Sequence, residues 1–518
     1  MLRAWSLVAV AAAVFGLGVW LVSPRFEIES PSLVDDWIAV TQGGDELGEL
    51  IRSGNAEEQR FRPSWTVWNA FQWHTFDAPD GLVGPNAWNL ARLAILVAGL
   101  TLLVALALPP PRGRAEAVVH ALVAGVPALL VVTVPKFARD LARFGTQEPL
   151  LVGGMALGGS LLVLAVRSVL RPTPLPRTRV AVFVTAGSVL WLAGVYQKET
   201  SLAVLPLLVA AVVAGRGRLR GWRSVSRPRQ RVLTAIGVVF LLPLTHVAIE
   251  SVRIAARGDL VYDAEVNAGR GILDGLEILY DWSTEVFSLT ARRVVIAALV
   301  LTAIVALVRR RLDLVALGAL GAGALTLVLA AQSGVAVSRY YIPTYALAGV
   351  ALALSLGRLP VVVQAAGVAA LALAFLPATE AYREVEAWAF EERAGGELVD
   401  MLAELDANGC SVAMAGIDQE TSMALAALVS RDERSRTAGC ASEDVHLVLR
   451  PYGEGAALAA ACAPRALELV RPFPLEGGDV EVHRCSRLGS APVRDPALGL
   501  LAPEQLVAAR RFEPGFAS

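Results

Sequence analysis

Two adjacent carboxylates, Asp35 and Asp36, are the residues of this 518-residue chain best suited to chemistry. They lie between Leu33 and Trp37, shortly after the first long hydrophobic segment. A carboxylate beside a second carboxylate in a partly apolar cleft has a raised pKa, which suits a general base. The alternative is structural, because either residue could cap a helix beginning at Trp37 or lie in a solvated acidic loop. Both interpretations fit these residues.

A second group of polar residues could bind a phosphate. Lys198 and Glu199 join two hydrophobic segments with almost no loop between them, and Lys136 is the chain's only other lysine. An ammonium can hold a phosphate as a point charge, whereas the alternative is a pair that reaches from the membrane interface to water. Arg339, which Tyr340 follows, either binds a phosphate through two hydrogen bonds or belongs to an interfacial aromatic belt.

Two further charged residues accompany these candidates. Arg62 precedes a Pro-Ser-Trp turn and could pair with Asp35 or Asp36. Glu148, between Gln147 and Pro149, is either a polar ligand or an interfacial carboxylate. The histidines are scattered without the spacing of metal ligands, so no metal site is predicted from them.

The composition indicates the setting in which these residues act. Hydrophobic residues make up 55% of the chain and the mean hydropathy is +0.55, values that indicate a polytopic membrane protein. The net charge is −1, so nothing in the overall charge favours nucleic acid as a partner. Arginine almost replaces lysine, and Ala, Val and Gly are abundant, which suggests a GC-rich and bacterial coding bias.

A membrane-spanning helix needs about 20 mostly apolar residues. Eleven segments are predicted to span, and residues 1–380 are predicted to form one helical membrane domain. The first segment follows a single arginine and is interpreted as an uncleaved signal anchor. The eleven predicted spans are 5–22, 88–108, 116–134, 149–166, 180–196, 201–214, 232–249, 294–308, 312–331, 341–357 and 361–377.

The arginines of the short connections predict the orientation. They gather in loops 109–115, 167–179 and 215–231, at 309–311 and at Arg358, and these positions alternate strictly with the other loops. By the positive-inside rule the N-terminus is cytoplasmic and the chain from 378 onward is outside the cell membrane. All the candidate residues then fall on the outer side, in the loops 23–87, 135–148, 197–200, 250–293 and 332–340.

Two of these outer loops show helical periodicity. Phe137, Leu141 and Phe144 share one face of a short helix that is predicted to lie in the membrane interface. Loop 250–293 contains a second candidate, with Ile272, Leu276 and Leu279 at helical spacing.

The tail 381–518 is predicted to be a small extracytoplasmic α/β domain. Helices are expected at 394–407, 419–430 and 455–462, and strands at 410–415, 444–449, 466–471 and 479–484. All four cysteines lie here, which predicts two disulfides in an oxidising compartment, the alternative being unpaired core cysteines. The strand that begins at Cys410 and the strand that ends at Cys485 could be neighbours.

Together these motifs resemble the GT-C superfamily of integral-membrane glycosyltransferases, over residues 1–380. Asp35-Asp36 resembles the family's acidic motif, and Lys198-Glu199 resembles its Lys-Glu step. Other elements resemble the branch related to protein O-mannosyltransferases: Arg62-Pro63, Trp88-Asn89-Leu90, Phe144-Gly145 with Glu148-Pro149, and Arg339-Tyr340-Tyr341-Ile342-Pro343. The tetratricopeptide repeats of some members are absent, which weakens the case for a protein acceptor.

The resemblance implies a polyprenyl-phosphate-linked sugar as donor and a glycan, lipid or protein as acceptor. It implies that Asp35, with Asp36, deprotonates the acceptor, and that Lys198 and Arg339 stabilise the departing phosphate. It leaves the need for a divalent metal open, since some relatives use one and others do not.

Two other functions are considered. A transporter or flippase for a lipid-linked glycan would place polar residues deep within its spans, and few are found there. A non-catalytic assembly scaffold would bind its partner through the outer domain. The discriminating observation is whether Asp35 lines the same cavity as Lys198 and Arg339.

Overall fold

The structure, a computed structural model, describes about two thirds of the chain in two compact units. The helical unit contains the described residues of 1–23, 45–68 and 85–385, and the sheet unit contains Pro24–Glu27, Val83, Gly84 and the described residues from Glu386 onward. The described residues are 2–27, 64, 67, 83–143, 146–171, 176–219, 226–257, 274, 277, 289–332, 338–375, 378–408, 410–415, 425, 445–449, 468–475 and 478–485.

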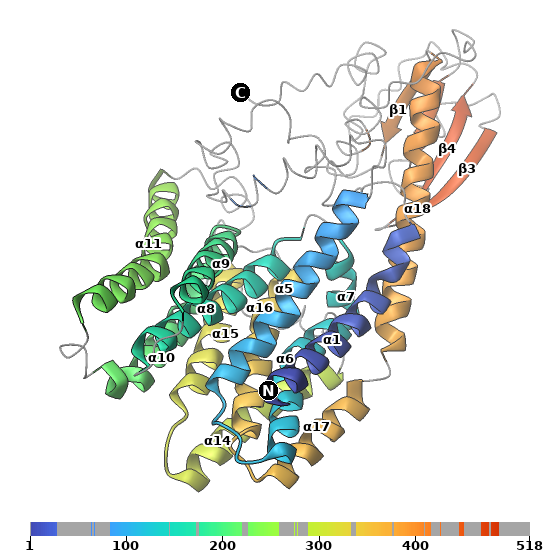
Figure 1. Cartoon of the computed structure of the whole chain (residues 1–518). Helices are drawn as coiled ribbons and strands as arrows, with labels where there is room; N and C mark the ends of the chain where they lie inside the picture. The colour runs from blue at the N-terminus through green and yellow to red at the C-terminus, as the bar shows by residue number, and fades with distance from the viewer. Residues whose placement is uncertain are drawn as a thin grey trace. The chain divides into compact units, whose positions relative to one another are not determined.

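Helices make up the helical unit (Figure 1). Their apolar runs end where arginines, prolines or polar pairs interrupt them, as expected for helices that must satisfy their backbone internally in lipid. The elements are α1 Leu2–Val22, α5 Val83–Ala107, α6 Arg114–Thr133, α7 Pro135–Ala142, α8 Glu148–Leu170, α9 Arg177–Val195, η3 Glu199–Val204, α10 Leu205–Leu219, α11 Arg227–Arg257, α14 Leu289–Arg309, α15 Leu314–Gln332, η5 Ser338–Tyr341, α16 Ile342–Leu356, α17 Val361–Phe375 and the start of α18 Thr379–Ala407.

Each of the eleven predicted spans coincides with helical structure. Among the described residues, seven helices are long and apolar enough to cross a membrane, which supports a helical membrane protein. Three more, at Thr200–Gly215, Val295–Arg309 and Leu314–Leu329, are apolar but shorter. The number eleven therefore remains a prediction.

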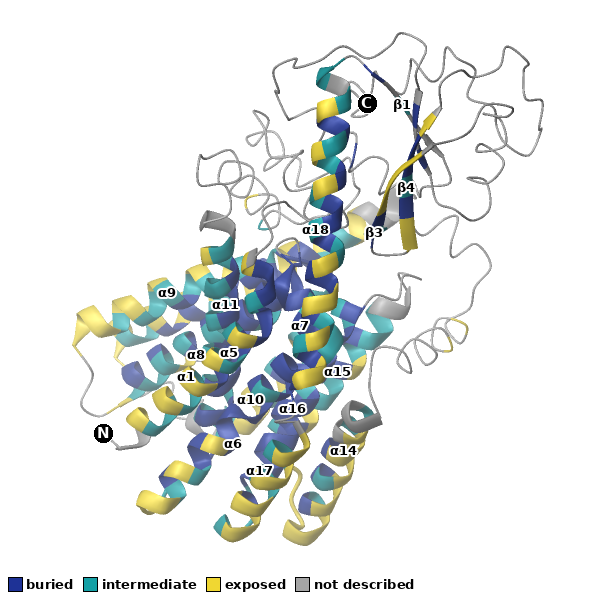
Figure 2. Ribbon diagram, turned by 90° about the vertical axis from the view of Figure 1, so that its right-hand side faces the viewer, coloured by how far each residue is buried: buried dark blue, intermediate teal, exposed yellow. Residues whose placement is uncertain are grey.

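The 15-residue helix α16 is the most deeply buried of the predicted spans. Every residue of α16 except Leu347 is buried, and the helix packs against α6, α14 and α15. Its many alanines, with Gly349 against Pro127 of α6, allow this close packing. By contrast, α9 and α11 expose large apolar side chains such as Val189 and Leu242, which suits contact with lipid (Figure 2).

The short helix predicted from Phe137, Leu141 and Phe144 is confirmed as α7, with one difference. Phe137 and Leu141 are buried in protein, and Phe137 packs edge-on against Tyr345 of α16 with ring centroids 5.6 Å apart. The described part of the apolar face therefore packs on the bundle, and contact of α7 with a membrane surface stays a prediction. Phe144 lies outside the described residues, as do Ile272, Leu276 and Leu279.

The sheet unit joins the second half of α18 to four strands: β1 Ser411–Ala415, β2 Val445–Leu449, β3 Glu468–Leu475 and β4 Gly478–Cys485. Their order is β1-β2-β4-β3, with β1 parallel to β2 and the other pairs antiparallel. Alternate residues face α18 and form a core that contains Leu398, Leu402, Val448, Phe473, Val480 and Val482. Gly478 opens β4 with φ 127°, a conformation that favours glycine.

The four predicted strands are thus confirmed, and three details differ. β1 and β4 are not neighbours, because β2 pairs with both of them and lies between. The helix predicted at 394–407 is longer and begins at Thr379. The division between the units falls after Val385 rather than after residue 380. Apart from Leu425, the predicted helices 419–430 and 455–462 lie outside the described residues.

Cys410, directly before β1, is disulfide-bonded. The described residues contain no free cysteine. Oxidation is therefore confirmed for Cys410, while the pairing of the four cysteines remains a prediction.

Candidate functional site

A buried ion pair joins two helix ends of the helical unit. Lys198 precedes η3 in an extended conformation, and Glu148 is the first residue of α8, followed by Pro149. The Lys198 Nζ lies 2.7 Å from the Glu148 Oε1, and the two side chains are 8% and 2% exposed. The start of a helix favours a carboxylate, because its first backbone N–H groups lack helical partners. Burying either charge without its partner would cost desolvation free energy. The pair therefore holds the start of η3 against the start of α8.

The aromatic ring of Tyr340 lies against the Lys198 ammonium of this pair. The Lys198 Nζ is 3.5 Å from the centre of the ring, and the Arg339 guanidinium carbon is 5.8 Å from it. A cation over a ring face is attracted by the electrons of the ring. The 3-10 helix η5 therefore brings the residues around 339 against the residues around 198 and 148.

The same short helix contacts a second buried carboxylate. The Ser338 hydroxyl donates a hydrogen bond of 2.6 Å to the Asp140 Oδ2, and Asp140 is 1% exposed. Burial raises the pKa of Asp140 to about 6, although Arg143, the Ser338 hydroxyl, Arg139 and Arg339 each lower it. Asp140 is therefore a carboxyl group whose pKa lies well above the usual range of an aspartate, because it is buried.

Two side chains of α5 donate hydrogen bonds to the segment between α7 and α8. The buried Arg92 donates to the backbone carbonyls of Arg143, at 2.6 Å, and of Thr146. Asn89, one turn earlier, donates to the carbonyl of Ala142 at 3.1 Å. These bonds satisfy carbonyls at the end of α7 that have no helical partner, and they fix Asp140 and Glu148 at the two ends of one braced segment.

A third carboxylate, Glu384, contacts α7. Glu384 accepts from Lys136 at 2.6 Å and lies 3.5 Å from Arg139. The described side chains of this charged cluster thus include five cations and three carboxylates: Lys136, Arg139, Arg143, Lys198 and Arg339 with Asp140, Glu148 and Glu384. The excess of positive charge favours an anionic ligand.

Four of the predicted site residues come together in this charged cluster: Glu148, Lys198, Arg339 and Tyr340. Glu199 begins η3 directly beside Lys198, and its side chain lies outside the described part. Asp35, Asp36 and Arg62 also lie outside the described residues, so their position relative to Lys198 stays a prediction. The nearest described neighbour of Arg62 is Ser64, whose N–H donates to the carbonyl of Tyr196 at 3.3 Å.

Sequence reasoning did not single out Asp140 or Arg92. A signal for Asp140 was present, because it lies three residues after Phe137 and one before Leu141, on the face of α7 assigned to apolar packing. A carboxylate on an otherwise apolar face is costly and therefore informative. Arg92 carried a similar signal, since it lies inside a predicted span.

The described residues contain no group of three or more His, Cys, Asp and Glu that could hold a metal ion. Comparisons of the chain with protein-family models, curated proteins and solved structures find no match. The fold and the site define the class on their own: a helical membrane protein with a buried charged cluster where distant connections meet.

Proposed function

We propose that this protein is a glycosyltransferase of the GT-C type, which moves a sugar from a polyprenyl-phosphate donor to an extracytoplasmic acceptor. The observation that carries the proposal is the convergence of Lys198, Arg339 and Tyr340 on Glu148, from segments far apart in the chain. These are the residues that resemble the family's Lys-Glu and Arg-Tyr elements. The acceptor is a cell-envelope glycan, a lipid or a protein.

The cations of the charged cluster suit a phosphate leaving group. Lys198 offers a compact ammonium and Arg339 a planar guanidinium, and both lie at the same aromatic ring. When the glycosidic bond breaks, negative charge develops on the phosphate oxygens, and fixed cations stabilise this charge. Glu148 keeps the Lys198 side chain in place while leaving the charged cluster positive overall.

The chemical step moves one sugar from the donor phosphate to the acceptor hydroxyl. Asp35, with Asp36 beside it, takes the proton of the acceptor hydroxyl, whose oxygen forms a bond to the anomeric carbon. The bond between that carbon and the donor phosphate breaks through an oxocarbenium-like state, and polyprenyl phosphate leaves.

Contacts between arginine-rich connections support the proposed orientation. Arg358 donates to Asp313 at 2.9 Å, and Arg309 donates to the carbonyl of Arg358, so the α14–α15 and α16–α17 connections meet. Arg167 donates to the carbonyl of Leu106 at 2.9 Å, which brings together the ends of α8 and α5. Arginine-rich ends of membrane helices face the cytoplasm, so the charged cluster would face outward across the plasma membrane.

Mass spectrometry of cell-envelope glycans, with and without the protein, tests the proposal. We expect loss of one defined sugar residue, restored by the natural chain. Asp35→Asn should lower transfer by about 10²–10⁴-fold, the usual share of a general base. Loss of the whole glycan from the surface, with its lipid-linked form accumulating inside, would instead indicate a flippase. Near-natural transfer by both Asp35→Asn and Asp36→Asn would refute the mechanism.

A further inference from the structure

Arginines gather where the end of α8 meets the starts of α9 and α11. Arg229 of α11 donates a hydrogen bond of 3.5 Å to the carbonyl oxygen of Arg171, which directly follows α8, and α11 contacts both α8 and α9. All six side chains are exposed except that of Arg229, which is half-buried. We call this group the arginine patch: Arg171, Arg177, Arg179, Arg227, Arg229 and Arg231.

The arginine patch has no carboxylate to balance its charge. Between residues 149 and 249 the only Asp or Glu is Glu199, which lies beyond the opposite end of α9. In the part of the chain that the structure describes, none of the six guanidinium groups forms an ion pair. Six neighbouring positive charges repel one another, so an anion at the patch would relieve this repulsion.

Other arginine-rich connections of the same unit do contain carboxylates. Arg358 donates to Asp313, and the backbone N–H of Arg112 donates to Glu116. The orientation of membrane helices depends on Lys and Arg in the connections and hardly on Asp and Glu. Orientation therefore accounts for the arginines of the patch, and it does not account for the missing carboxylates.

Exposed apolar side chains follow the arginines along both helices. Val182, which is 61% exposed, lies one turn after Arg179 on α9. On α11, Val232 directly follows Arg231 and is also exposed. Cations followed by apolar surface match the order of headgroup and hydrocarbon in a bilayer. An acidic soluble protein or a nucleic acid would use only the cations.

We propose that the arginine patch binds the headgroup of an anionic phospholipid, whose acyl chains lie along the exposed apolar faces of α9 and α11. The proposal goes beyond the transferase function and does not depend on it. Guanidinium groups bind phosphate through paired hydrogen bonds, and each arginine near a membrane surface adds attraction for anionic lipid. A lipid with two phosphates should therefore bind more tightly than a lipid with one.

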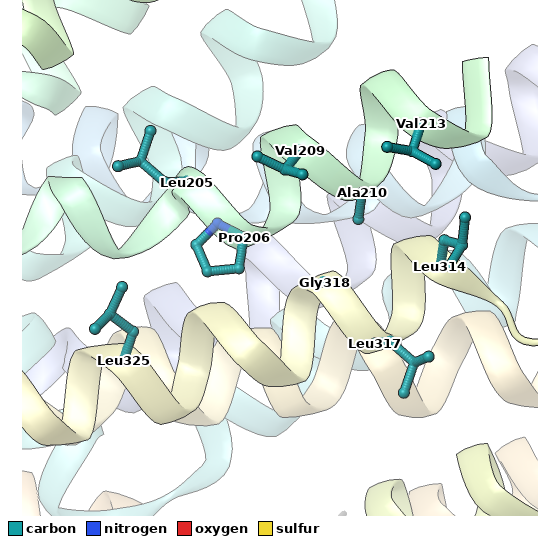
Figure 3. Close-up of a pocket in the computed structure, with 9 residues that line it drawn as sticks. All are labelled: Leu205, Pro206, Val209, Ala210, Val213, Leu314, Leu317, Gly318 and Leu325. Carbon is teal, nitrogen blue, oxygen red and sulfur yellow. The ribbon is translucent and has the colours of Figure 1, made fainter. Parts of the chain in front are cut away.

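The groove between α10 and α15 offers an apolar surface for comparison (Figure 3). Every side chain that lines it is apolar or belongs to glycine, and Figure 3 shows Val209 of α10 among them. Val209 is 61% exposed, as Val182 is. A lipid held by its acyl chains alone would use both surfaces, whereas a lipid held by the arginine patch depends on Val182 and not on Val209.

Lipid titration of the purified full-length chain in detergent, followed by native mass spectrometry, tests the proposal. The probes are tetraoleoyl cardiolipin, dioleoyl phosphatidylglycerol and dioleoyl phosphatidylcholine. Arg179→Gln with Arg227→Gln removes one exposed cation from each of two helices. The matched control is Arg310→Gln with Arg311→Gln, which removes two exposed arginines close to Asp313 in the chain. Arg179→Lys with Arg227→Lys keeps both charges.

We expect the first glutamine variant to bind cardiolipin roughly tenfold more weakly, because each arginine contributes to the attraction of anionic lipid. The matched control and the lysine variant should bind cardiolipin as the natural chain does, with an affinity that falls as salt rises. Unfolding temperatures without added lipid, equal in all four proteins, show that the variants are folded. Equal cardiolipin affinity in the first glutamine variant and its control would overturn the proposal, as would equally tight binding of phosphatidylcholine.

Two further measurements separate the acyl chains from the headgroup. Val182→Ser should weaken cardiolipin binding roughly fourfold, about the loss of one buried methylene contact, and Val209→Ser should leave it unchanged. The same effect from both serine variants would overturn the placement of the acyl chains. Displacement of cardiolipin by soluble polyglutamate at equal charge concentration would overturn the lipid assignment in favour of an acidic soluble partner.

Discussion

Two ion pairs of the helical unit are chemically alike and placed very differently. The Arg358–Asp313 pair, among the arginine-rich connections, is 2.9 Å long with side chains 29% and 12% exposed. The Lys198–Glu148 pair is 2.7 Å long and almost fully buried. Asp313 also caps α15, because its Oδ1 accepts from the N–H groups of Val315 and Ala316 at 3.1 and 3.3 Å.

The two pairs differ in the desolvation free energy that each requires. The Asp313 carboxylate caps the start of α15 and keeps some contact with solvent. Forming its pair with Arg358 therefore removes less water from the two charges. Lys198 and Glu148 lose their hydration, and an apolar pair of similar volume would often be as stable or more stable there. Buried charges that are retained at such a cost are candidates for function.

Removing one partner of each pair should produce the largest difference in stability between the two ion pairs. Lys198→Met leaves the buried Glu148 carboxylate without its hydrogen-bonded partner, so we expect a loss of about 3 kcal/mol or more in unfolding free energy. Arg358→Met should cost less than about 1 kcal/mol, because that pair is partly exposed. Chemical unfolding in detergent measures both.

The double variant Lys198→Met with Glu148→Gln sharpens this contrast. Removing both charges should restore much of the loss, since no unpaired charge remains. An equal loss for Lys198→Met and Arg358→Met would show that burial does not distinguish the two pairs.

The pH dependence of stability gives a second contrast, through Asp140. Because burial raises its folded pKa from 3.8 to about 6, the folded state binds the proton more tightly than the unfolded state does. Stability from this group is therefore greatest at low pH and is lost as pH rises through about 6. Between pH 5 and pH 8 we expect a loss of about 1 kcal/mol.

Unfolding of Asp140→Asn across this pH range provides the comparison. The amide cannot ionise, so this part of the pH dependence should disappear, whereas Asp313→Asn should retain it. An unchanged slope in Asp140→Asn would mean that Asp140 is not the group responsible.

A further small effect concerns the cap at Asp313. Asp313→Ala removes the acceptor for two N–H groups at the start of α15 and should cost about 1 kcal/mol, the usual value of an N-cap. Asp313→Asn keeps an acceptor oxygen and should cost less. If both substitutions cost the same, the ion pair with Arg358 would matter more than the cap.

The sequence predicted the helices and strands well because their signals are local. Apolar runs and alternation mark α1 to α17 and β1 to β4, and the meeting of Glu148, Lys198, Arg339 and Tyr340 follows from their common position beside predicted spans. The order of strands was harder, because adjacency of β2 and β4 depends on the path of the chain between them. Asp140 was missed because its role depends on Ser338, nearly 200 residues away.

Donor binding tests the central claim most directly. The affinity of polyprenyl-phosphate-linked sugars, extracted from the native membranes, is measured for the natural chain and for Lys198→Met, Arg339→Met and Arg358→Met in nanodiscs. Our account predicts that the first two variants bind at least about tenfold more weakly, because each loses a charge-assisted contact with the phosphate, and that Arg358→Met binds normally. Equal affinity in all four proteins would contradict the assignment of the charged cluster as the donor site.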